Sequence, residues 1–235
     1  MCAHYEGISD PKAFAEWFDA SPPSAMGKLD LWPATMGAMI RRPAEADSGD
    51  EAVPVRESVP AMFGLVPHWA TDIKIARNTY NARSETMALK SSFRDAWRKA
   101  RHCIIPATAI YEPDWRSGKA MPTRIARTDG RAMGIAGIWD SWRQPDGSWM
   151  QSYSMLTINA DDHELMRNFH KPTDERRMVV ILAETAYSGW LSASTESSME
   201  FMRPYPAERL ISKAEPSGKK KSRCVARDKE MAFPK

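Results

Sequence analysis

The chain has 235 residues, of which 43% are hydrophobic, so it can bury a core and is expected to form one domain or one domain with a tail. No apolar run approaches the ~20 residues that span a bilayer, and the first residues lack a secretory signal pattern, which predicts a cytoplasmic protein with no membrane partner. Cys2, Cys103 and Cys224 are odd in number and far apart in the sequence, which argues against a disulfide framework, and no pair has the Cys-x-x-Cys spacing of a zinc site. The net charge of +3 does not by itself indicate a nucleic-acid partner.

The first hundred residues predict two helices and two strands. Asp10 before Pro11 is typical of a helix start, and Phe14, Trp17 and Phe18 then follow at the spacing of one helical face. The further predictions are strands at 35–40 and 61–66, a polar surface loop at 43–57, and a helix at 85–99.

The second half predicts short strands separated by turns. Asp129-Gly130 indicates a hairpin, and Asp146-Gly147 indicates a second tight turn. The strands are predicted at 102–105, 108–112, 123–127, 133–139, 149–158 and 177–182, with a short helix that Asp161 or Asp162 caps and that runs through Phe169, and a late helix at 184–191. This pattern predicts an α+β domain with a mainly antiparallel, barrel-like sheet.

The expected domain covers residues 1–211, and residues 212–235 are expected to form a basic tail. The tail contains the run GKKKSRCVAR. Such a run is most often a solvated segment that attracts anions without sequence preference, so it does not decide the function.

Cys2 is the first residue with unusual chemical potential. A small second residue permits removal of Met1, which would leave Cys2 with a free α-amine beside its thiol. The amine titrates near ~7.7–8.0 and the thiol near ~8.5, so both have reactive forms at neutral pH. The amine can condense with an aldehyde, and the thiol can then close a thiazolidine ring intramolecularly. Taken alone, however, this position favours an incidental cysteine at a frayed terminus.

Four other side chains suit the same chemistry. Asn81 can donate and accept hydrogen bonds, and the planar guanidinium of Arg83 can donate two hydrogen bonds to a phosphate. Glu112 follows an apolar run, where partial desolvation would raise its pKa into the range of a general acid or base. His170 suits proton transfer near neutral pH. Each region also has a purely structural interpretation. Ser84 could cap a helix while Arg83 pairs with a surface acid. Glu112 could face solvent at a strand end, and His170 could be a packing or surface residue.

One apparent metal motif is incomplete. His163-Glu164 begins like the zinc-binding pattern H-E-x-x-H, but Arg167 stands where the second histidine is required. The sequence therefore predicts no metal site and calls for no cofactor.

The order of several motifs along the chain resembles one family. The motifs are Met1-Cys2, FGLVPHWA (63–70), NARSET (81–86), CIIPATAIYE (103–112), AGIWDSW (137–143), LTINAD (156–161) and FHK…RRMVVIL (169–182). In this order they resemble the SOS response-associated peptidase (SRAP) family from Met1 to about Leu191. The resemblance implies a curved, barrel-like β-sheet with flanking helices and a positively charged groove for single-stranded DNA.

The resemblance also implies an abasic-site sensor that crosslinks covalently to single-stranded DNA after removal of Met1. Its implied catalytic residues are Cys2 as the nucleophile that forms a thiazolidine, Asn81 as the residue that positions the amine and the sugar, and Glu112 and His170 as proton-transfer groups. Its implied DNA contacts are Arg83 on a phosphate, Trp69 on an unstacked base, and His4 and either Arg176 or Arg177 on phosphates. The protein is expected to be a monomer that associates with the nucleoid during DNA damage.

Three departures from the family pattern concern DNA affinity and junction preference more than chemistry. Ala3 and His4 replace the usual Gly-Arg after the cysteine, and Pro113 replaces a tryptophan that often follows Tyr-Glu, with Trp115 two positions later. The segment KPTDER (171–176) lengthens the connection after His170.

Two alternative functions remain open at this stage. The first is a cysteine peptidase that uses Cys2, Glu112 and His170, including autoproteolytic release of Met1, which is compatible with crosslinking. The second is a non-catalytic module that binds single-stranded DNA, in which the cysteine is incidental and binding is reversible and salt-sensitive.

Overall fold

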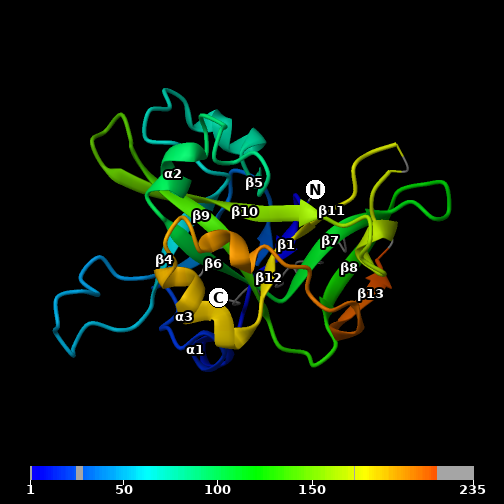
Figure 1. Ribbon diagram of the computed structural model, residues 1–235, viewed down its shortest axis with the longest axis horizontal. Coiled ribbons are helices and arrows are strands. Elements are labelled where there is room, and N and C mark those ends of the chain that lie inside the picture. Colours follow the sequence, from blue (N-terminus) through cyan, green and yellow to red (C-terminus); the bar gives the residue numbers. More distant parts are fainter. Residues whose placement is uncertain (1, 25–28, 172, 216–235) are drawn as a thin grey trace, which may run out of the picture.

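The computed structural model describes residues 2–24, 29–171 and 173–215, and they form a closed barrel beside a second sheet (Figure 1). The barrel strands are β3 (Met36–Arg41), β4 (Glu57–Phe63), β6 (His102–Ala107), β9 (Met133–Arg143) and β10 (Trp149–Asn159). They pair in the order β10-β4-β3-β6-β9, and pairing of β9 with β10 closes the ring. All of these pairings are antiparallel except that of β10 with β4. The predicted α+β, barrel-like fold is confirmed.

Three short strands extend the barrel along β9 and β10. They are β5 (Asn81–Arg83), β11 (Arg177–Val179) and β12 (Ile181–Leu182). Leu156 and Thr157 of β10 pair with β5, while Thr157 also pairs with Val179 of β11. A strand has two edges, so β5 and β11 lie on opposite sides of β10. This places the ends of both short strands around the same stretch of β10.

The second sheet contains the amino-terminal strand. Its order is β13-β8-β7-β1-β2, with β1 (Tyr5–Glu6), β2 (Asp30–Leu31), β7 (Ala109–Asp114), β8 (Met121–Arg127) and β13 (Leu210–Ala214), and neighbouring strands are antiparallel. Residues 212–214 therefore pair with β8, although the tail was expected to begin at 212. The part of the expected tail from 216 onward lies outside the described residues.

Short helices cover the barrel. Asp10 caps α1 (Pro11–Phe18) by accepting a 2.9 Å hydrogen bond from the Lys12 amide, as the sequence predicted. Phe18 of this helix stacks on Tyr187, the first residue of α3 (Tyr187–Ser192), and Figure 1 shows the two helices side by side. The other helices are α2 (Arg94–Arg98), α3 (Tyr187–Ser192) and the 3-10 turns Ile73–Asn78, Met166–Asn168, Glu184–Ala186, Ser198–Phe201 and Ala207–Arg209. In the described part of the chain, no helix has the length and apolar character to cross a membrane.

Four local predictions were wrong. Asp129-Gly130 joins β8 to β9, which belong to different sheets, so the dipeptide forms a turn without a hairpin. The helix predicted at 85–99 is helical only at Arg94–Arg98, and separate turns precede it. The helix predicted through Phe169 is reduced to the 3-10 turn Met166–Asn168. The strand predicted at 177–182 is divided at Val180, because its first half pairs with β10 and its second half pairs with β9.

An aromatic cluster joins the amino-terminal strand to the barrel. The hydroxyls of Tyr5 in β1 and Tyr153 in β10 share a hydrogen bond, and both residues are fully buried. Phe63 packs edge-on against Tyr5, with ring centroids 5.2 Å apart, and stacks with Tyr153 at 5.7 Å. These contacts fix the start of the chain against the barrel wall.

Candidate functional site

The amino-terminal segment lies beside the strand that carries Glu112. Tyr5 and Glu6 pair with Ile110 and Ala109 of β7, and the Tyr111 amide donates a 2.9 Å hydrogen bond to the carbonyl oxygen of His4. This antiparallel register carries the chain before Tyr5 alongside the end of β7. Residues more than a hundred positions apart are therefore held at one place by backbone pairing.

Cys2 is buried at this place, with only 1% of its surface exposed. Its thiol donates to the carbonyl oxygen of His4 at 3.4 Å. The side-chain amide of Asn81, at the start of β5, donates to the carbonyl oxygen of Cys2 at 2.8 Å. The Oδ1 atom of Asn81 is also buried and, among the described residues, accepts no hydrogen bond. It is thus available to an amine or a sugar hydroxyl.

Glu112 is the buried acid of the site. It is 3% exposed, and burial raises its pKa to about 7. Burial also raises the pKa of the Cys2 thiol well above its ordinary value, and the charge of Glu112 raises it further, so the two groups are electrostatic neighbours. Both forms of Glu112 are therefore populated near neutral pH, which suits a group that both gives and takes protons.

His170 is buried and uncharged at neutral pH. It is 8% exposed, and burial lowers its pKa to about 4. The charges of Arg176 and Arg177 act in the same direction, while that of Asp174 opposes them. A neutral imidazole can exchange hydrogen bonds, but it is not a reservoir of protons at pH 7.

Arg83 and Arg177 share acidic partners in this structure. Arg83 pairs with Glu175 at 2.7 Å, and Arg177 pairs with the same Glu175 at 2.6 Å and with Glu85 at 2.9 Å. Arg177 also donates to the carbonyl oxygen of Thr157 at 2.7 Å. The charges of the two arginines and the two glutamates cancel, so this edge of the barrel is not an open cationic site.

The side chains expected to contact DNA differ in their solvent exposure. The side chain of Arg177 is only 2% exposed and is committed to carboxylates and backbone, so this geometry does not favour its expected contact with a phosphate. Arg83 is 44% exposed. His4 lies between two aromatic rings, and its Nε2 atom contacts Asp30, so this geometry does not favour its expected contact with a phosphate either.

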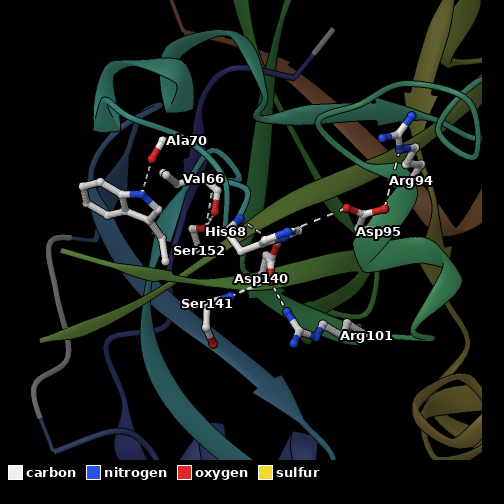
Figure 2. A network of polar contacts seen from close by, with 10 residues as sticks. Val66, His68, Ala70, Arg94, Asp95, Arg101, Asp140, Ser141 and Ser152 are labelled. Atoms are coloured by element: carbon white, nitrogen blue, oxygen red, sulfur yellow. Dashed lines mark hydrogen bonds and ion pairs between the residues drawn. The ribbon is translucent and has the colours of Figure 1, made fainter. Parts of the chain in front are cut away.

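Trp69 is 46% exposed, and the residues on either side of it in the sequence, His68 and Ala70, are held by hydrogen bonds. Figure 2 shows the contacts of these two residues. The His68 amide donates to the buried Asp140 at 3.0 Å, and Asp140 also pairs with Arg101. After Trp69, the carbonyl oxygen of Ala70 accepts a 2.6 Å hydrogen bond from the Trp142 indole. These anchors present Trp69 to solvent on a fixed loop.

Sequence patterns did not indicate three members of this region. Tyr80 has a pKa raised by burial and by the charges of Cys2 and Glu112, so it adjoins the site. Trp32 stacks on His4, and Glu175 holds Arg83. The insertion at 171–176 was visible as a departure from the family, but an ion pair between an inserted acid and Arg83 depends on tertiary contact.

Residues 1–214 match the family model described as SOS response associated peptidase (SRAP), and the chain belongs to this family. A crystal structure of a protein from Bordetella bronchiseptica has 48% identity and a TM-score of 0.82, covering 91% of this chain and 99% of that one. One from Bacteroides thetaiotaomicron shares the fold at 20% identity, with a TM-score of 0.71 and coverage of 92% and 93%.

Curated relatives carry a functional name. The chain is 33% identical over 150 residues to the abasic site processing protein YoqW of Bacillus subtilis, covering 62% of this chain and 63% of the relative. It is 26% identical over 228 residues to the abasic site processing protein HMCES of Mus musculus, covering 83% and 59%. The matched region thus spans about three fifths of the length of these relatives.

Proposed function

We propose that this protein captures abasic sites in single-stranded DNA by a covalent bond to Cys2 after Met1 is removed. The observation that carries the proposal is the buried hydrogen bond between Asn81 and Cys2, beside Glu112, a buried acid with a pKa of about 7 whose charge acts on the Cys2 thiol. Relatives named abasic site processing proteins support the choice of lesion. The substrate is the aldehyde of the ring-opened sugar.

The reaction needs an amine, a thiol and a proton shuttle. The α-amine of Cys2 adds to the aldehyde carbon, and the carbinolamine loses water to give an imine. Glu112 in its protonated form donates the proton that leaves with this water. The thiol then adds to the imine carbon, its proton returns to the carboxylate or the nitrogen, and a five-membered thiazolidine results. The net reaction releases one water and requires no oxidant or cofactor.

The other residues position the reacting groups. Asn81 holds the Cys2 carbonyl and offers its Oδ1 to the amine or the sugar. His170, neutral at pH 7, acts through hydrogen bonding at the sugar. Arg83 exchanges its Glu175 partner for a phosphate beside the lesion, and Trp69 supports an unstacked base.

The thiol environment favours aldehyde capture over peptidase chemistry. A cysteine peptidase depends on a thiol whose pKa is lowered by a cationic neighbour. Here burial and the charge of Glu112 raise the pKa of Cys2. In aldehyde capture the amine attacks first, and the thiol follows in an intramolecular step, so a thiolate is not required at the start.

Intact-protein mass spectrometry tests the proposal. The protein is incubated with a single-stranded oligonucleotide that carries one abasic site, and a tetrahydrofuran analogue without an aldehyde serves as the control DNA. Wild type should lack Met1 and gain the oligonucleotide mass less one water. Cys2→Ala should not form the stable adduct, whereas Cys103→Ala, a change at another buried cysteine, should retain it. Retention of Met1, or no adduct where DNA binding is measurable, would overturn the proposal.

A further inference from the structure

Three aromatic rings form a continuous stack next to the candidate site. His4 lies between Trp32 and Tyr111, with ring centroids 4.1 Å from each and interplanar angles of 14° and 12°. Near-parallel rings at this spacing on both sides place the imidazole in the middle. The stack ends at Trp32, which is 48% exposed although His4 covers one face of its indole.

Asp30 fixes the orientation of the His4 and Trp32 rings. One carboxylate oxygen contacts His4 Nε2, and the other accepts a 3.3 Å hydrogen bond from the indole nitrogen of Trp32. The Trp32 backbone is held as well, because Thr35 exchanges hydrogen bonds with its amide at 3.1 Å and its carbonyl oxygen at 2.6 Å. An exposed indole held in this way loses little side-chain entropy when a ligand stacks on it.

The stack is joined by sequence to both reacting residues. His4 is two positions after Cys2, and Tyr111 immediately precedes Glu112. The Trp32 ring is therefore linked through His4 to the segment that carries Cys2. Trp149 provides a contrast, since it is 67% exposed at the start of β10 and, in the described part of the chain, no aromatic ring stacks on it.

A nucleobase beside an abasic site lacks a stacking partner on the side of the lesion. Such a base can stack on an aromatic side chain without sequence preference, because every base has a flat π-face. We propose that the exposed face of Trp32 is a subsite for a nucleobase of the same DNA strand that flanks the abasic nucleotide. This inference rests on the proposed function and specifies the flanking base as part of the recognised substrate.

Equilibrium binding to non-reactive DNA tests the subsite apart from crosslinking. The probe is a single-stranded oligonucleotide with one tetrahydrofuran residue, and a second probe replaces both flanking nucleotides with tetrahydrofuran as well. Trp32→Ala should weaken binding to the first probe by roughly 5- to 140-fold, which corresponds to about 1–3 kcal/mol for one stacked base. Trp32→Phe should restore part of the affinity, and Trp149→Ala should bind like wild type.

The second probe identifies the flanking base as the ligand. Wild type should bind it more weakly than the first probe, whereas Trp32→Ala should bind both probes equally. If Trp32→Ala discriminates between the probes as wild type does, or matches Trp149→Ala on the first probe, the subsite is excluded. Failure of wild type to crosslink would instead overturn the proposed function, so the two failures are distinguishable. Circular dichroism and melting of each variant confirm that it is folded.

Discussion

Asn81 and Cys2 are 79 positions apart and meet in a buried hydrogen bond of 2.8 Å between the side-chain amide and the main-chain carbonyl oxygen. The bond joins β5 of the barrel to the segment that precedes β1 of the other sheet. It holds the residue that carries the proposed nucleophile by its backbone carbonyl, without engaging the amine or the thiol. The position of Cys2 thus depends on a contact between two separate sheets.

Replacing Asn81 should therefore slow crosslinking as well as lower stability. Asn81→Ala removes the donor to the Cys2 carbonyl and leaves a buried acceptor, which costs about 1–3 kcal/mol. We expect the crosslinking rate to fall by at least about tenfold. The measurement is the single-turnover rate with abasic DNA, beside thermal unfolding of the same variant. Asn78→Ala, an exposed residue in the same segment, should keep the wild-type rate. Equal rates for the two variants would contradict the positioning role.

Glu112→Gln should change both the rate and its pH dependence. The pKa of about 7 means that the protonated acid disappears as the pH rises through 7. The wild-type crosslinking rate should therefore lose its acid-catalysed component above this pH. In the glutamine variant the rate should be lower by about 10²–10⁴-fold and should lack this step. Crosslinking rates measured from pH 5.5 to 8.5 test this prediction. If the glutamine variant shows the same fall in rate around pH 7 as wild type, Glu112 is excluded as the proton donor.

The same residue should make stability pH-dependent. Burial raises the folded-state pKa of Glu112 from an ordinary 4.5 to about 7. Its protonated form is thus favoured in the fold, and this contribution to stability is fully present below pH 4.5 and lost as the pH rises through 7. Urea unfolding at pH 5 and pH 8 should show that the stability of Glu112→Gln relative to wild type is greater at pH 8. If the stability of Glu112→Gln relative to wild type were greater at pH 5 than at pH 8, the raised pKa of Glu112 would be contradicted.

Glu175→Gln should strengthen DNA binding. Glu175 occupies the Arg83 guanidinium at 2.7 Å, where a phosphate would otherwise bind, whereas Arg177 keeps its second partner Glu85. Removing this carboxylate charge should raise affinity for single-stranded DNA. It should also steepen the salt dependence by up to about 0.7 in log Kd per log salt, the value for one additional phosphate contact.

Glu208→Gln is the matched control for this effect, because it changes the net charge equally at an exposed position. Binding is measured by fluorescence anisotropy with tetrahydrofuran DNA between 50 and 200 mM salt, the range in which phosphate contacts have a strong effect. If both variants shift affinity by the same amount, the effect is one of general charge and Glu175 does not compete for the Arg83 site.

Gly37→Ala should destabilise the junction between the two sheets. A Cβ atom at position 37 would lie 2.7 Å from the hydroxyl oxygens of both Tyr5 and Tyr153. Relief of this contact requires both buried rings to move, and overpacking of this kind costs about 1–3 kcal/mol. Thermal unfolding measures the loss. Gly189→Ala is the control, since its Cβ would meet only ordinary contacts at 3.4 Å and alanine favours the helix.

Local sequence signals were reliable where neighbouring residues decide the structure. The Asp10 cap and Pro11 place the start of α1, and Phe14 and Phe18 form its buried face. Asp146-Gly147 lies in the turn between β9 and β10, where Arg143 pairs with Trp149. In these cases a cap, a turn and a periodicity of apolar side chains suffice.

The same signals were misleading where distant strands compete for a segment. Asp129-Gly130 has the composition of a hairpin, but β8 pairs with β7 and β13 while β9 pairs within the barrel. In the helix predicted at 85–99, Met87, Phe93 and Trp97 are all buried, although only the last turn is helical. Burial of apolar side chains was predictable there, whereas the backbone form was not.

The sequence by itself determined the fold class, the family and the residue types that the proposed reaction with an aldehyde requires. Tertiary structure alone decided that Cys2 and Glu112 share one buried environment, that Arg83 is paired with Glu175, and that His4 is stacked beneath Trp32. The physical reason is that pKa values, ion pairs and ring stacking depend on the distance and solvent exposure of groups that lie far apart in the chain.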